Sequence, residues 1–244
     1  MEKRGQATLF VIVAIFIIVT VVVVFFIWGN KKVSDISSTE SDDINSEIQN
    51  CVDSTLVDAL RVIGLQGGYF IIPQEINYIQ TNISKVAYGL YNSQNILPPL
   101  DIIENEINSY VESTLALCLN EENFPEVEIK EGEVNAKTTI KEDFVSSQTV
   151  FPVSVIKKGS TQVLQKDYFS SIDIDLMNIH KTSNEIIDKI DTNEEYFDLT
   201  YFTDLDYQVT ILPYDDHIFV YSLTDPESEL EEIPYTFKFA VKIK

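Results

Sequence analysis

Two pairs of carboxylates are the residues of this chain best suited to chemistry. Asp173 and Asp175 stand two positions apart, and so do Asp204 and Asp206. On a strand this spacing puts both side chains on one face, where paired carboxylates can bind a cation or share acid–base work. The chain holds 39 Asp and Glu residues, however, so such pairs also arise by chance. No D-x-D-x-D-G loop completes a calcium site, and we expect neither a metal site nor a catalytic site.

The two histidines belong to no recognisable catalytic motif. His180 lies within the predicted helix 176–190, where packing or surface exposure is its ordinary role, and His217 directly follows two aspartates in a segment of turn composition. The sequence has neither a G-x-S-x-G elbow nor an H-E-x-x-H helix. We therefore expect no enzyme activity and no cofactor. The alternative is an enzyme with an unrecognised carboxylate site, which would need a deep cleft lined by acids.

The two cysteines point to a disulfide. Cys51 lies on the apolar stripe of the predicted helix 43–65, and Cys118 lies on that of the predicted helix 100–120. If these helices pack antiparallel the sulfurs approach each other, and a bond between them would stabilise the fold by ~4 kcal/mol in a chain-entropy estimate. A disulfide is typical of proteins outside the cytoplasm. The alternative is two buried free thiols in a reducing compartment.

Two short signals concern turns and modification. Gly67 and Gly68 follow the first predicted helix, where they suit a C-cap and turn. A phosphate-binding glycine loop would instead stand between a strand and a helix. Asn82-Ile83-Ser84 is an N-x-[ST] sequon, so Asn82 is a glycosylation acceptor if this part of the chain lies outside the cytoplasm.

The segment 7–28 predicts a transmembrane helix. It holds 22 residues without charge, Pro or Gly. As a helix it would span about 33 Å, enough for a hydrocarbon core of about 30 Å. A cleaved secretory signal would have a shorter apolar run, followed by a small-residue cleavage site, and neither is present. We therefore expect the bilayer to be a partner of the chain through residues 7–28, which remain as an anchor.

Basic residues flank this segment on both sides, two before it at Lys3 and Arg4 and two after it at Lys31 and Lys32. The positive-inside count is nearly balanced, and the terminal amine tips it toward a cytoplasmic N-terminus. Residues 1–6 are then predicted to be cytoplasmic and the C-terminal domain extracytoplasmic, in agreement with a disulfide.

The stretch Lys3-Arg4-Gly5-Gln6 before an apolar helix resembles the class III, prepilin-type signal of archaeal surface proteins. That resemblance implies cleavage between Gly5 and Gln6 with the helix retained. Subunits of that kind often carry Glu five residues after the cut, where this chain has Phe10. The departure bears on filament assembly more than on processing. The alternative is an ordinary signal-anchor.

A broader resemblance, to a group of archaeal membrane-anchored proteins, covers most of the chain. It rests on the KRGQ start, on the Cys-containing helix ending in GLQGGY and on the C-terminal PYTFKFAV strand. No activity comes with it.

The net charge of the chain is −22 at pH 7. Nucleic acid phosphates and anionic headgroups repel such a surface, so we expect no nucleic-acid partner. The acidity is spread along the chain without long blocks of like charge, as in a solvated, soluble surface.

Hydrophobic periodicity predicts an α+β fold beyond the anchor, with an antiparallel sheet and about three helices. Residues 29–43 are expected to form a polar stalk, 44–122 a helical part with the cysteines, and 123–244 a β-rich part. Within the last, Lys158-Gly159 and the segment 213–216 are predicted hairpin turns. The segments 196–202 and 207–224 are expected to be strands, and 233–244 alternates so that Tyr235, Phe237, Phe239, Val241 and Ile243 share one face.

These observations favour a membrane-anchored extracytoplasmic binding or structural module, pilin-like or adhesive, with a protein partner or self-association at the cell surface. An accessory or assembly subunit of a membrane complex is the main alternative, and it would expose an apolar patch. A membrane-tethered enzyme is the third.

Overall fold

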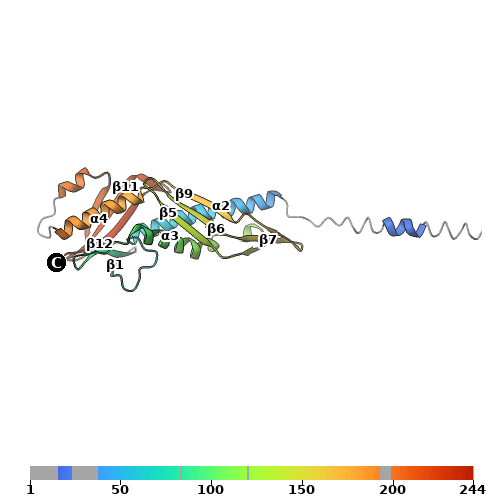
Figure 1. Cartoon of the computed structure of the whole chain (residues 1–244), viewed down its shortest axis with the longest axis horizontal. Coiled ribbons are helices and arrows are strands. Elements are labelled where there is room, and N and C mark those ends of the chain that lie inside the picture. The colour runs from blue at the N-terminus through green and yellow to red at the C-terminus, as the bar shows by residue number, and fades with distance from the viewer. Residues whose placement is uncertain (1–15, 24–37, 83, 120, 193–198, 244) are drawn as a thin grey trace, which may run out of the picture.

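The structure is a computed structural model that describes residues 16–23, 38–82, 84–119, 121–192 and 199–243. It has an α+β fold, as predicted, but its helices pack on three sheets instead of the single antiparallel sheet expected (Figure 1). Among the described residues, no helix is both long enough and apolar enough to cross a bilayer. The predicted span 7–28 lies outside them except for residues 16–23, which are helical.

The largest sheet has the strand order β1-β2-β12-β11-β10, with β3 paired to β2. Two smaller sheets have the orders β4-β7-β8 and β5-β6-β9. The predicted antiparallel pairing holds for every described pair except β2 with β12, which is parallel. The bounds are β1 (Tyr78–Gln80), β2 (Lys85–Tyr91), β3 (Gln94–Asn95), β4 (Glu128–Glu131), β5 (Asn135–Ile140), β6 (Val145–Val150), β7 (Val153–Lys157), β8 (Ser160–Val163), β9 (Asp167–Ile172), β10 (Gln208–Pro213), β11 (Ile218–Leu230) and β12 (Ile233–Lys242).

Helix α2 (Ser38–Leu65) begins earlier than predicted, so residues 38–43 of the expected stalk 29–43 are helical. Residues 29–37 of the expected stalk lie outside the described residues. Glu40 in the first turn suits the positive end of the helix dipole, and its carboxylate accepts from Lys157 Nζ at 2.8 Å. Lys157 also contacts Glu126 at 3.1 Å, so a cation on β7 holds the start of α2.

The end of α2 follows the predicted turn chemistry. Gly67 and Gly68 have φ angles of 78° and 95°, and the N–H of Gly68 donates to the carbonyl of Ile63 at 2.9 Å. This is the Schellman arrangement, which requires a left-handed residue just past the helix. The predicted hairpin turn at Lys158-Gly159 is also present, with both residues at positive φ between β7 and β8.

One core joins all three sheets to the helices α2, α3 (Leu100–Thr114) and α4 (Leu176–Thr192). Alternate residues of β12 point into this core, in agreement with the predicted shared face. Tyr235, Phe237, Phe239 and Val241 are all at most 1 % exposed. The apolar stripe of α2, from Ile44 to Ile63, lies in this core, and α2 contacts both β12 and β9. The opposite face of the sheet carries a second, smaller apolar cluster: Ile79, Val86, Tyr88, Val220 and Ala240.

The expected strand 196–202 is wrong where the structure describes it, because residues Leu199–Asp204 form the 3-10 helix η3. Its aromatic side chains pack on other elements instead of pairing in a sheet. The ring of Tyr201 lies 4.5 Å below Lys189 Nζ of α4, and Phe202 contacts the ring of Tyr221 in β11. Tertiary contacts thus override the β propensity of this aromatic segment.

Helix α3 (Leu100–Thr114) runs beside the edge strand β5 and supplies that edge with hydrogen-bond acceptors. Four residues along a helix advance about 6 Å, and two residues along a strand advance about 6.8 Å, so every fourth side chain of α3 meets every second N–H of β5. The acceptors are Glu112 to Ala136 N at 2.9 Å, Asn108 to Thr138 N at 2.7 Å and Glu104 to Ile140 N at 2.8 Å. A helix therefore covers an edge that would otherwise be open to pairing.

We expect Asn108→Leu to lower the free energy of unfolding by about 1–3 kcal/mol, because a buried N–H is left without an acceptor. The N–H belongs to Thr138, which is 4 % exposed. Urea unfolding of the purified chain measures the loss. Asn108→Asp is the matched control, because it keeps an acceptor oxygen. Equal stability of the two variants would contradict the role assigned to Asn108.

Candidate functional site

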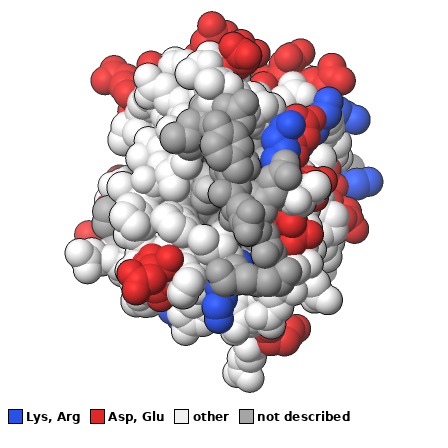
Figure 2. Space-filling model, turned by 90° about the vertical axis from the view of Figure 1, so that its left-hand side faces the viewer, with Lys and Arg blue, Asp and Glu red and all other residues white. Residues whose placement is uncertain are grey.

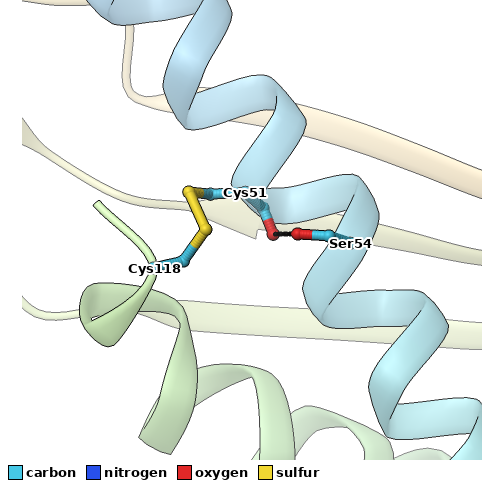
Figure 3. The surroundings of a disulfide bond; sticks show 3 residues. All are labelled: Cys51, Ser54 and Cys118. Carbon is cyan, nitrogen blue, oxygen red and sulfur yellow. Dashed lines mark hydrogen bonds between the residues drawn. A yellow bond between two sulfur atoms is a disulfide. The ribbon is translucent and has the colours of Figure 1, made fainter. Parts of the chain in front are cut away.

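A disulfide joins Cys51 in α2 to Cys118, which follows the 3-10 turn η1 (Leu115–Leu117) at the end of α3 (Figure 3). The S–S distance is 2.04 Å and the Cα atoms are 5.7 Å apart. The predicted pairing is thus confirmed, although α3 is shorter than the predicted 100–120. The bond ties α2 to the segment that follows α3.

Three of the four aspartates singled out by their spacing line one hollow of about 570 Å³. Asp173, Asp175 and Asp206 lie there together, whereas Asp204 ends η3 and does not line it. A β-bulge in β11, between Asp225 and Glu229, adds two further carboxylates that the sequence did not point out. The lining residues are Asp143, Asp173, Asp175, Asp206, Tyr207, Asp225, Glu227 and Ser228.

Two carboxylates of this acidic hollow already accept hydrogen bonds from other groups of the chain. Tyr207 Oη donates to Asp175 Oδ2 at 2.6 Å, and burial first, then this bond and neighbouring carboxylates, raise the pKa of Tyr207. Asp225 accepts from Ser228 Oγ and, at 2.9 Å, from the N–H of Glu227. These bonds hold the bulge in place. In the part of the chain that the structure describes, no three His, Cys, Asp or Glu residues are grouped so that they could hold a metal ion.

The structure places the histidines apart from the hollow. His180 is 8 % exposed, and its Nε2 lies 2.8 Å from the carbonyl of Pro98, to which it donates as the neutral tautomer. Burial lowers the pKa of His180, against the opposing effect of this hydrogen bond. His217 lies in the turn between β10 and β11, where its backbone N–H donates to Asp215 at 2.8 Å. His180 is therefore a packing residue.

The sequon residue Asn82 is exposed in the short connection between β1 and β2. Thr81 closes this connection, because its N–H and its hydroxyl both donate to the carbonyl of Ser84, at 2.9 and 2.7 Å. The N–H of Ser84 in turn donates to Thr81 Oγ1 at 3.0 Å. The acceptor asparagine thus stands on a tight, outward-facing turn.

Asn82 also lines a groove on the face of the largest sheet that carries the smaller apolar cluster. We call it the Tyr214 groove; its volume is about 290 Å³. Leu212 and Tyr214, in β10 and the turn after it, are 55 % and 51 % exposed. The groove is lined by Thr81, Asn82, Val86, Leu212, Pro213, Tyr214, Val220, Ser222 and Lys238.

Charge is unevenly distributed on the end of the body that faces away from the start of α2 (Figure 2). Asp and Glu side chains gather around its periphery, and Lys and Arg side chains are fewer there. The acidic composition is therefore visible as a surface property, in keeping with a solvated exterior.

The predicted processing site Gly5-Gln6 lies outside the described residues, so its cleavage stays a prediction. Comparisons with models of protein families, with curated proteins and with solved structures found no match to this chain.

Proposed function

We propose that this chain is a membrane-anchored extracytoplasmic module that binds or organises partners at the cell surface, pilin-like or adhesive in type and without catalysis of its own. The apolar segment 7–28 anchors it, and the folded part from α2 onward is displayed outside. The observation that carries the proposal is the Cys51–Cys118 disulfide in an acidic body that follows an apolar, uncharged span.

The disulfide supports the external placement because reducing systems keep cytosolic thiols free. Cys51 is 3 % exposed and sits within the main core, so the bond belongs to the packing of α2 against the end of α3. The two cysteines of the chain are both used in it. A cytoplasmic body would leave them as two free thiols, with Cys51 buried and Cys118 exposed.

The shape of the body supports a display role. Helix α2 begins at one end of an elongated body, and the C-terminal strand β12 finishes near the opposite end (Figure 1). A span that precedes α2 would therefore hold the body at one end and present the far end outward. The large sheet and its exposed groove belong to that outer part.

Protease treatment of intact cells tests the placement. We expect added protease to degrade the body while the chain fractionates with membranes, and a maleimide mass tag to label Cys51 and Cys118 only after reduction. Recovery of the chain from the aqueous fraction would overturn the proposal. So would a body untouched by protease whose two thiols react without reduction.

N-terminal sequencing of the membrane-extracted chain separates two versions of the anchor. Gln6 as the first residue supports class III processing and the pilin-like version. An intact Met1 supports an ordinary signal-anchor and removes the pilin-like version while leaving the display role.

A further inference from the structure

Apolar side chains supply most of the exposed lining of the Tyr214 groove. Its floor includes Val86 and Val220, and its wall is formed by Leu212 and Tyr214, each more than half exposed. Burial of exposed apolar surface is favourable by roughly 25 cal/mol per Å², so an occupant that covers these side chains would be stabilised there. The volume of about 290 Å³ is near the lower end of ligand sites, at roughly 300–1,000 Å³.

The aromatic ring in this groove is held in place. Tyr214 Oη donates to the carbonyl of Gln80 in β1 at 3.3 Å, so the side chain reaches from the β10–β11 turn to the opposite edge of the sheet. A fixed aromatic face with partial negative charge suits the C–H groups on the apolar face of a sugar ring. Lys238 and Ser222 also line the groove and can hydrogen-bond to sugar hydroxyls.

The covalent attachment point for such a sugar stands on the groove itself, because Asn82 lines it and is the acceptor of a sequon. Asn82 is exposed on a turn that Thr81 and Ser84 close by three hydrogen bonds. A glycan joined there would start within contact range of the groove. The occupant is thereby specified by the chain.

We propose that Asn82 carries an N-linked glycan whose first sugar rests in the Tyr214 groove. In the transfer, a bond forms between Asn82 Nδ2 and the sugar C1 while the bond from C1 to the phosphate of a lipid-linked donor breaks, and the amide proton leaves with the phosphate product. The donor and its transferase act outside the cytoplasm, so this inference rests on the proposed function.

Mass spectrometry of the full chain from the membranes of its own cells tests the modification. We expect a glycan on the peptide that contains Asn82, and its loss in Asn82→Gln. Amide hydrogen exchange then tests whether the first sugar binds in the Tyr214 groove. Peptides from 208–224 should exchange about fivefold more slowly in the glycosylated chain than in Asn82→Gln. A tenfold change in exchange rate would correspond to ~1.4 kcal/mol of added local stability.

Tyr214→Ser should abolish this protection and leave the glycan in place. Phe169→Ser is the matched control, because Phe169 is an exposed aromatic residue of β9 at 62 % exposure and does not line the groove. It should keep both the glycan and the protection.

Each other outcome overturns a defined part. If Asn82 carries a glycan but exchange at 208–224 is not slower, the sugar does not bind in the Tyr214 groove. An unmodified Asn82 in a chain that external protease degrades overturns the modification and leaves the proposed function standing. An unmodified Asn82 in a chain that protease cannot reach overturns both.

Discussion

Replacing both cysteines, as Cys51→Ala with Cys118→Ala, is expected to lower the free energy of unfolding by about 4 kcal/mol. The bond joins residues separated by 67 positions, and the entropy that a cross-link removes from the unfolded chain grows with the length of the closed loop. A loss of this size is a large part of the free energy of unfolding of a typical domain, which is roughly 5–15 kcal/mol. Denaturant unfolding of the purified chain measures it.

Ser54→Ala is the control for this double variant. Ser54 Oγ donates to the carbonyl of Cys51 at 3.2 Å, next to the disulfide but without touching its sulfurs (Figure 3). We expect a loss of about 1 kcal/mol or less from this hydrogen bond. Reduction of the unaltered chain should reproduce the double variant. If the double variant unfolds at the same denaturant concentration as the unaltered chain, the cross-link does not stabilise the fold as argued.

The helices and the disulfide could be predicted because their signals are local or nearly so. The apolar positions of α2 recur at helical spacing. Cys51 falls on its buried stripe, and Cys118 follows α3 closely enough that packing of the two helices brings the sulfurs together, although Cys118 itself is exposed. The alternation along β12 likewise predicted that Tyr235, Phe237 and Phe239 share the core face, since side chains of a strand alternate between its two faces.

The acidic hollow could not be predicted, because it depends on a bulge that periodicity does not reveal. Asp225-Pro226 reads as the end of a strand, whereas β11 continues to Leu230 through a register shift. That shift turns Asp225 and Glu227 toward Asp175, about fifty positions earlier in the sequence. The parallel pairing of β2 with β12 and the groove that holds Tyr214 are equally non-local.

A second large effect is expected at Phe239, for which we predict that Phe239→Ala lowers the free energy of unfolding by about 3–5 kcal/mol. Phe239 is 0 % exposed, and its ring stacks on Tyr221 at 5.5 Å with an interplanar angle of 6°. It also fills the space that Gly89 leaves on β2, where an added Cβ would lie 3.0 Å from the Phe239 ring. Removal of the ring opens a cavity between the sheet and α4, which the packed backbone cannot close.

Tyr235→Phe is the matched control, because it changes a buried aromatic residue on the same face of β12 without removing its ring. The hydroxyl of Tyr235 has no hydrogen-bond partner within the described part of the chain, although the residue is only 1 % exposed. Loss of a buried, unpaired hydroxyl removes a desolvation cost of about 1–3 kcal/mol, so this variant should equal or exceed the unaltered chain in stability. Urea unfolding of Tyr235→Phe and of Phe239→Ala, measured under the same conditions, compares the two variants. If Tyr235→Phe were as destabilising as Phe239→Ala, ring packing on this face could not be the source of the effect, and a partner for the Tyr235 hydroxyl would have to exist.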